Sequence, residues 1–261
     1  MKKGLQTDRL AKMHEQRQAR VLAVTLARGG SKSVPRKNIR PILGVPVIAY
    51  TIAEAVRSKY ITRYIVSTDD EVIRQVAIRY GAEAPFLRPA HLATDQATSL
   101  SALQHAVAWA EKQEGLKYEY VIELMCTNPM KSVEDIDTAI EKLISTGADS
   151  VIGMSKLEDH HPIRIKKIVD DRIVDFCLPE TPETRRQDLK PEAYIRNGSI
   201  YALRRDVLMD QNQRHGTADS RPYIMPAERS VNVDTPIDFM VAEILLTQNP
   251  RPYVRPLSEV E

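Results

Sequence analysis

Four short apolar runs alternate with longer segments of helical periodicity between residue 21 and about residue 154, and this alternation constrains the fold most strongly. The runs are continuous, as in strands that are buried on both faces of a parallel sheet. They cover residues 21–26, 63–68, 118–124 and 149–154. Because right-handed crossover helices join successive parallel strands, the pattern predicts an α/β fold with a mostly parallel sheet and helices on both faces.

The helical segments carry recognisable end signals. Helices are predicted over residues 47–59, 69–81, 99–113, 133–147 and 236–248. Pro46 suits the first turn of the first helix, and Thr68 and Gly81 suit the N-cap and C-cap of the second. Ser132 followed by Asp135 predicts an arrangement close to a capping box at the start of the fourth helix.

The chain changes character between about residue 155 and residue 192. The run "IRIKKIVDDRIVDF" predicts a hairpin that turns at Asp170 and Asp171. A stretch rich in proline and charge follows, and the apolar run at 197–204 predicts a return to the parallel sheet. We expect one domain with four parts: an N-terminal extension at 1–20, the main body at 21–250, an inserted arm at about 155–192 and a C-terminal tail at 251–261.

The composition excludes several classes of protein. A chain of 261 residues with 43% hydrophobic and 28% charged residues can bury a large core, so wholesale disorder is excluded. The 37 basic residues are balanced by 35 acidic ones, which argues against a nucleic-acid binder that works by bulk charge. Cys126 and Cys177 have no CxxC partner, so neither a disulfide framework nor a zinc site is expected, and a reducing cytoplasm is the expected setting.

Membrane association is not expected. No apolar run reaches the roughly 18 residues that a spanning helix needs. Residues 1–20 hold six Lys or Arg but no apolar segment of the kind found in secretory signals. A loose helix and an unstructured extension are both open for this segment.

A basic loop follows the first predicted strand. The sequence "LARGGSKSVPRKNIRPILGVP" spans residues 26–46 and surrounds Gly29 and Gly30 with the cations Arg28, Lys32, Arg36, Lys37 and Arg40. Ligands of open α/β sheets bind beyond the carboxyl ends of the strands, where this loop lies. Neither the Walker A motif nor the GxGxxG fingerprint is present. Because glycines let backbone N–H groups approach an anion, the loop predicts a polyphosphate site, with a solvated basic turn as the alternative.

The segment "ARGGSKSVPRKNI" resembles the N-terminal signature of the acylneuraminate cytidylyltransferase family, A-R-x-x-S-K-x-x-x-x-K-N. The resemblance continues through "RPAHLATDQATS", "RRQDLKPEAYIRNGSIYAL" and "RSVNVDTPIDFMVAE" and covers most of residues 21–248. Members of this family react CTP with a nine-carbon ulosonic acid and release the CMP-sugar and pyrophosphate. The resemblance implies a Rossmann-like nucleotidyltransferase sheet, this transferase activity and Mg²⁺ as cofactor.

The resemblance also implies roles for individual residues. Arg28, Lys32 and Lys37 are the expected catalytic cations, because charge that develops on the leaving pyrophosphate must be stabilised. The nucleotide would be held by Arg28, Ser31, Lys32, Lys37, Asn38, Arg88, Ala97 and Ser99, the sugar acid by Arg186, Asn197 and Tyr201, and Mg²⁺ by Asp234.

Two departures from the family pattern leave the substrate open. Met125 and Cys126 stand where many members carry Gln-Pro, and the Gln usually reaches the sugar acid. Asn232 stands where many members carry a second Asp two residues before the metal ligand. The candidate substrates are therefore N-acetylneuraminate and other ulosonic acids of the legionaminic, pseudaminic or octulosonic type. A nucleotide-binding module without catalysis is the alternative from another class, and no general base is evident.

The inserted arm predicts a homodimer. Its hairpin is too small to bury a core of its own. In the resembling family this arm crosses to the partner subunit, which implies that Arg186 acts in the neighbouring active site.

Overall fold

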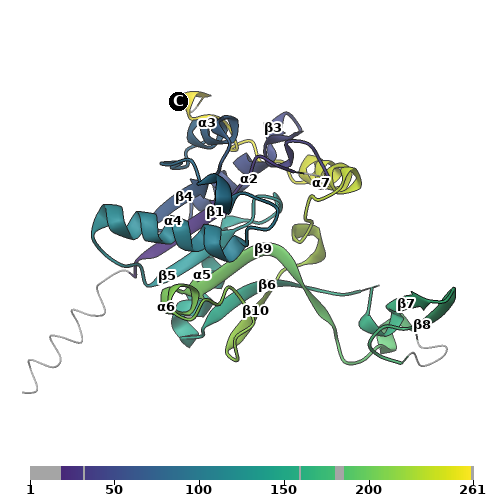
Figure 1. Cartoon of the computed structure of the whole chain (residues 1–261). Coiled ribbons are helices and arrows are strands. Elements are labelled where there is room, and N and C mark those ends of the chain that lie inside the picture. The colour runs from purple at the N-terminus through teal and green to yellow at the C-terminus, as the bar shows by residue number, and fades with distance from the viewer. Residues whose placement is uncertain (1–18, 32, 159, 180–184, 260–261) are drawn as a thin grey trace, which may run out of the picture.

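A six-stranded sheet, with the strand order β10-β6-β9-β5-β1-β4, forms the centre of the protein (Figure 1). The computed structural model describes residues 19–31, 33–158, 160–179 and 185–259. Almost all of the predicted N-terminal extension therefore lies outside the described residues. The sheet strands are β1 (Val21–Leu26), β4 (Arg63–Ser67), β5 (Tyr120–Leu124), β6 (Ser150–Lys156), β9 (Tyr194–Arg204) and β10 (Ser220–Ile224).

Helices cover both faces of this sheet, as predicted. Along β1, Val21 and Ala23 pack on one face and Leu22 and Val24 on the other, and all four are fully buried. The first face is covered by α2 (Val47–Ala55), α3 (Glu71–Arg79) and α5 (Val133–Thr146). The second is covered by α4 (Ser99–Glu114) and α6 (Arg205–Met209). A continuous apolar strand is needed where both faces are covered, which explains the composition of β1.

The helix ends agree with the sequence only in part, because α2 ends at Ala55, four residues before the predicted end at residue 59, and the N-cap of α3 differs. Ser132 and Asp135 form a complete capping box at α5, as predicted. The predicted N-cap of α3 was wrong, because Asp70 accepts from the backbone of the first turn and Thr68 only accepts from the N–H of Asp70. A carboxylate two residues nearer to the helix satisfies the unpaired N–H groups better than the hydroxyl.

Two features of the sheet differ from the prediction. The strand β9 pairs antiparallel with both β5 and β6, so the expected return to a parallel strand at 197–204 was wrong in direction. The edge strand β10 was not predicted, because Pro222 interrupts its pattern. An edge strand tolerates proline, since one side of it needs no ladder hydrogen bond.

A third layer packs outside α2. The helix α7 (Pro236–Gln248) matches the predicted span, and it lies against α2 and the short hairpin of β2 (Pro41–Ile42) and β3 (Val45–Pro46). In the C-terminal tail, Arg251 donates to the carboxylate of Glu54 on α2 and to two backbone carbonyls. The tail is therefore bound to the main body.

The segment that was predicted as an inserted arm extends away from the sheet. Figure 1 shows β7 (Lys166–Val169) and β8 (Arg172–Asp175) far from the sheet, at the ends of long extensions of β6 and β9. The two strands pair antiparallel, and Asp170 and Asp171 adopt positive φ angles of 47° and 58° at the turn.

Short 3-10 segments lie at Lys37–Ile39, Ala90–Leu92, Pro162–Arg164, Arg186–Asp188, Ala227–Arg229 and Leu257–Glu259. In the described part of the chain, no helix is long and apolar enough to cross a membrane.

Candidate active site

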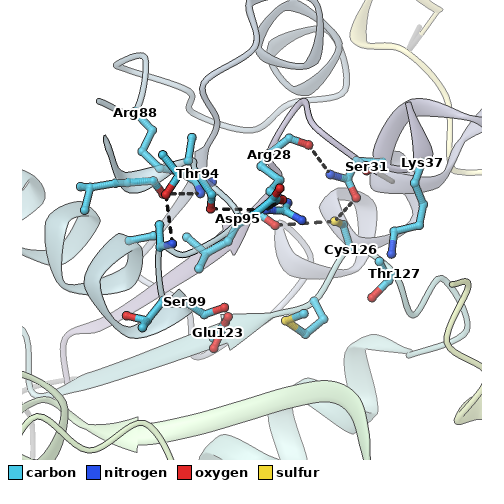
Figure 2. A pocket seen from close by; sticks show the side chains of 18 of the residues that line it. Arg28, Ser31, Lys37, Arg88, Thr94, Asp95, Ser99, Glu123, Cys126 and Thr127 are labelled. Carbon is cyan, nitrogen blue, oxygen red and sulfur yellow. Dashed lines mark hydrogen bonds and ion pairs between the residues drawn. The ribbon is translucent and has the colours of Figure 1, made fainter. Parts of the chain in front are cut away.

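A cavity of about 500 Å³ opens at the carboxyl ends of β1 and β5, where ligands of such sheets bind. Figure 2 shows Lys37 and Thr127 on one side of it and Arg88, Thr94 and Ser99 on the other. Every predicted nucleotide residue that the structure describes lines it: Arg28, Ser31, Lys37, Asn38, Arg88, Ala97 and Ser99. Lys32 lies outside the described residues.

Buried hydrogen bonds hold the basic loop in shape. The side chain of Asn38 donates to the backbone carbonyl of Arg28 at 2.9 Å and accepts from the thiol of Cys126 at 3.3 Å. Gly29 packs against Asp70, where a Cβ would lie 2.8 Å from a carboxylate oxygen. Neither Gly29 nor Gly30 adopts positive φ, which occurs at Arg36 instead. Gly29 is thus required for close packing rather than for an unusual backbone angle.

The two sides of the cavity mouth carry opposite charges. Arg28 pairs with Asp95 at 3.1 Å, and the two side chains are 39% and 54% exposed. An exposed pair of this kind contributes little to stability. Arg28 is therefore available to exchange Asp95 for a phosphate group.

The wall of the cavity that contains Arg88 is built from the segment before α4. Arg88 is only 6% exposed and donates to the hydroxyl and backbone carbonyl of Ser67 at the end of β4. Burial lowers the pKa of Arg88. Thr98 caps α4, so Ala97 and Ser99 lie at the positive end of a 16-residue helix dipole.

Lys131 organises the loop that follows β5, and the sequence analysis missed it. Its side chain is fully buried, and Nζ donates to Thr51 Oγ1 at 2.7 Å and to the carbonyls of Met125 and Asn128 at 2.7 and 2.5 Å. This places Cys126 at the cavity wall. Burial raises the pKa of the Cys126 thiol to about 11, which disfavours the thiolate form that a nucleophile needs.

A second cavity of about 480 Å³ contains the predicted sugar-binding residues Asn197 and Tyr201. Asn197 is held by a hydrogen bond to Ser230 at 3.0 Å, and it packs against Gly153, where a Cβ would lie 2.7 Å from Asn197 Oδ1. Asn232 also lines this cavity.

One chain of polar contacts links the two cavities. Lys37 of the first cavity donates to Asp234 Oδ1 at 2.5 Å. Asn232 of the second cavity donates to Asp234 Oδ2 at 2.6 Å. The N-cap of α7 is Thr235, which forms a capping box with Asp238. The carboxylate of Asp234 is therefore not used as a helix cap and is directed to Lys37.

The residues around Asp234 suit a hard cation that takes most of its ligands from a substrate. The side-chain oxygen of Asn232 is buried and has no hydrogen-bond partner within the described ranges. A carboxylate and an amide oxygen are ligands that Mg²⁺ accepts when phosphates supply the others. Among the described residues, no group of three or more His, Cys, Asp or Glu forms a cage for a metal.

Arg186 lies apart from the other sugar-side residues. It is on the arm, its side chain is 58% exposed, and it faces Glu158 at 3.7 Å. It lines neither cavity of its own chain. Its role in a sugar site stays a prediction that requires a second subunit.

The buried ion pair between the two cavities also escaped the sequence analysis. Glu123 is fully buried on β5 and lines the first cavity, and its partner Arg214 lines the second. A carboxylate inside an otherwise apolar strand is unusual unless it is paired. The Glu in the strand sequence "YVIEL" therefore indicated that a buried cation lies nearby. Nothing in the sequence around Arg214 identified it as the partner.

A family profile described as Cytidylyltransferase matches residues 22–245. The chain belongs to the cytidylyltransferase family. The resemblance inferred from the basic loop is thereby confirmed.

Curated cytidylyltransferases resemble this chain over nearly their whole length. The pseudaminic acid cytidylyltransferase of Campylobacter jejuni is 32% identical over 87% of this chain and 97% of that protein. The CMP-N,N'-diacetyllegionaminic acid synthase of Campylobacter jejuni is 32% identical over 88% of this chain and 96% of that protein. Among solved structures, a CMP:2-keto-3-deoxy-manno-octonic acid synthetase complexed with CTP shares the fold, with a TM-score of 0.65, 21% identity and coverage of 88% of this chain and 100% of that one.

The buried Lys131 predicts a pH-dependent stability for this cytidylyltransferase. Burial lowers the pKa of Lys131 from 10.5 to about 7. Between these two values the unfolded chain binds one more proton than the folded chain, so this residue makes stability rise with pH. Relative to Lys131→Met, the wild type should gain at most about 1.4 kcal/mol of unfolding free energy per pH unit in that window. Urea unfolding of both proteins from pH 6 to pH 10 measures this, and parallel curves would contradict it.

Proposed function

We propose that this cytidylyltransferase couples CTP to a nonulosonic acid and releases the CMP-sugar and pyrophosphate. The observation that carries this proposal is the contact chain from Lys37 through Asp234 to Asn232, which joins the basic cavity to the cavity with Asn197 and Tyr201. The first cavity suits a triphosphate and the second suits a polyhydroxylated acid. The charged side chains of Lys37 and Asp234 lie where the two cavities adjoin.

In this proposal the anomeric hydroxyl of the sugar acid attacks the α-phosphorus of CTP in line. A bond forms between that oxygen and phosphorus, the bond to the bridging oxygen breaks, and pyrophosphate leaves. Arg28 and Lys37 stabilise the charge on the phosphate oxygens and on the leaving group. No covalent enzyme intermediate is needed.

We propose an acid of the pseudaminic or legionaminic type as the substrate, in preference to N-acetylneuraminate. Two of them, each about one-third identical to this chain over most of its length, carry those acids in their names. Met125 is consistent with this choice, because a thioether cannot replace the hydrogen bonds of the Gln that many members carry there.

We further propose that Asp234 and the side-chain oxygen of Asn232 hold Mg²⁺ together with the triphosphate. The metal supplies positive charge where the phosphates carry several negative charges. Lys37 shares the carboxylate of Asp234 and so adds a fixed cation beside the metal. We place the reaction in the cytoplasm, where the free thiols Cys126 and Cys177 stay reduced.

The first test measures pyrophosphate release from CTP with a panel of ulosonic acids, with and without Mg²⁺. Wild type should turn over at least one pseudaminic- or legionaminic-type acid. Lys37→Ala and Arg28→Ala should each lower kcat/KM by about a hundredfold or more, because a cation on the transferring phosphates acts mainly in the transition state. Lys112→Ala on the exposed end of α4 is the matched control. Near-normal turnover in Lys37→Ala would favour the alternative interpretation, in which the basic loop is a solvated turn.

The second test concerns the metal site. Asp234→Asn should abolish Mg²⁺-dependent turnover, because an amide is a much weaker ligand for a hard cation than a carboxylate. Asn232→Asp should lower the Mg²⁺ concentration that gives half-maximal rate. It should also lower Tm without metal, because two carboxylates would then face each other where Asn232 now donates to Asp234. Full activity of Asp234→Asn would place the metal elsewhere.

We also propose that the enzyme is a homodimer in which the arm packs on the partner subunit. Ile168 and Ile173 are paired across the hairpin and are 68% and 73% exposed, and Phe176 is 61% exposed. A largely apolar cavity of about 830 Å³ beside the sugar cavity, lined in part by Met154, Tyr194 and Ile224, offers a complementary surface. Burial of these groups against a second copy would remove apolar surface from water.

The third test disrupts this contact with Ile168→Glu/Ile173→Glu. The variant should be monomeric by light scattering at micromolar concentration, retain CTP binding and lose sugar-dependent turnover. Val72→Glu, which changes an exposed apolar residue on α3, is the control and should stay dimeric. A wild-type protein that is monomeric and fully active would contradict the dimer.

A further inference from the structure

The sugar cavity carries more positive charge than the residues assigned to it explain. Besides Asn197 and Tyr201, it is lined by Arg196 of β9 and by Arg214 and His215 of the segment between α6 and β10. The sequence analysis assigned no role to Arg196, Arg214 or His215.

Arg214 is already neutralised. Its Nε and Nη2 donate to the two oxygens of Glu123 at 2.6 and 2.9 Å, and its guanidinium lies 4.7 Å from the centre of the Tyr201 ring. A bidentate pair with a fully buried carboxylate fixes the position of Arg214. This residue therefore forms a rigid wall and has no net charge to offer a ligand.

Arg196 is paired with a neutral group instead. Its Nη1 lies 2.5 Å from Nε2 of His215. A guanidinium has only donors, so His215 must accept through Nε2 and be the neutral imidazole with its proton on Nδ1. Within the described ranges, Arg196 has no carboxylate partner in an ion pair. The cavity therefore contains one uncompensated guanidinium beside one imidazole lone pair.

The strand geometry explains why Arg196 reaches this position. The register of β9 against β6 shifts between Ile152 and Met154, opposite Gly153. Gly198 has a positive φ of 60° in the same stretch. Bulges of this kind redirect side chains and are frequent beside active sites. The bulge directs both Arg196 and Asn197 to the cavity that holds Tyr201.

We propose that Arg196 binds the carboxylate of the sugar acid and that His215 accepts the proton of the attacking hydroxyl. This proposal rests on the proposed function, since an ulosonic acid carries its carboxylate and its anomeric hydroxyl on adjacent carbons. The substrate thus presents an anion beside a donor, and the cavity presents a guanidinium beside an acceptor at 2.5 Å. The pair Arg196 and His215 is complementary to this arrangement.

The proton-transfer step balances. The hydroxyl oxygen forms its bond to the α-phosphorus, its proton moves to Nε2 of His215, and the electron pair of the broken phosphoanhydride bond leaves with pyrophosphate. When the substrate binds, its carboxylate accepts the hydrogen bonds of Arg196. Nε2 of His215 then no longer accepts from the guanidinium. The imidazolium then loses its proton to solvent before the next turnover.

The surroundings of His215 favour its neutral form. Arg196 and Tyr201 of β9 and Arg214 of its own segment line the same cavity as His215, and Arg214 is paired with Glu123. Arg221 of β10 lines the apolar cavity of about 830 Å³, to which His215 also contributes. Burial, followed by the charges of Arg196 and Arg214, lowers the pKa of His215 below its ordinary value. The base is thus unprotonated at neutral pH, and kcat/KM should fall only when the pH drops through this lowered pKa.

The carboxylate part of the proposal is tested with an accepted acid and its methyl ester. Wild type should prefer the acid in kcat/KM by at least about tenfold, as expected for loss of a charge-assisted hydrogen bond. Arg196→Ala should raise KM for the acid, leave CTP affinity unchanged and lose the preference for acid over ester. Arg204→Ala, at the other end of β9 and paired with Asp149 and Asp206, is the control and should keep the preference. A preserved preference in Arg196→Ala would overturn the assignment.

The proton-acceptor part is tested by the pH profile of kcat/KM. His215→Gln retains a hydrogen-bond acceptor but cannot hold the proton, so kcat should fall by about a hundredfold and the acidic limb should disappear. Unchanged CTP binding shows that the variant is folded. If His215→Gln fails that check, His215→Asn is measured in the same way. A retained acidic limb with near-wild-type kcat would show that another group takes the proton.

The two levels of inference fail in different ways. If wild type releases no pyrophosphate with any ulosonic acid, the proposed function is wrong and this assignment falls with it. If wild type is active and the Arg196 and His215 variants behave like wild type, only this assignment is wrong.

Discussion

The antiparallel pairing of β9 with β5 determines how the two cavities meet. In this register Glu123 of β5 lies opposite Tyr201 of β9. Glu123 lines the first cavity and Tyr201 the second, so one strand pair forms the wall between them. A parallel strand at this position would need a crossover connection and could not carry the arm out and back as the antiparallel β6–β9 pair does. The reversal of one strand therefore provides both the shared wall and the arm.

Buried ionisable groups hold the surroundings of the first cavity in a single arrangement. Lys131, Glu123 and Arg88 are all buried, and each is bonded to backbone carbonyls, hydroxyls or an opposite charge. Removing such groups from water costs free energy that their contacts only partly repay. They therefore contribute more to geometry than to stability. At Lys131 the benefit is the fixed loop from Met125 to Asn128, which borders the first cavity.

Local signals in the sequence predicted the features that depend on neighbouring residues. The apolar run of β1, the capping box at Ser132 and the turn at Asp170 each involve only a few consecutive positions. The direction of β9 could not be predicted, because a strand buried on both faces has the same apolar pattern in either direction. The strand β10 was missed because proline is usually evidence against a strand, and only its edge position makes Pro222 acceptable.

The residues of the candidate site likewise fall into two groups: those that are contiguous in sequence could be predicted, and pairs that join distant segments could not. The basic loop is contiguous, so its residues were predicted together, and those that the structure describes line one cavity. The pairs that connect distant segments were not visible: Lys37 and Asp234 are 197 residues apart, and Glu123 and Arg214 are 91 apart. Arg196 and His215 are closer, 19 residues apart, but a bulge in β9 brings them together, and no local pattern identifies a bulge of that kind.

The two halves of the site differ in how firmly the core holds them. In the first cavity, which we propose as the nucleotide side, Asn38, Arg88 and Cys126 are each less than 7% exposed and are bonded to the ends of the central strands or to the basic loop. On the sugar side, Arg196 is exposed, and its cavity lies next to the edge of the sheet and the root of the arm. A substitution on the nucleotide side disturbs packed strands, whereas one at Arg196 or His215 changes the cavity without moving the core. Under the proposed function, the nucleotide is constant, and the acid that the enzyme accepts is set by a few side chains on β9 and the segment before β10.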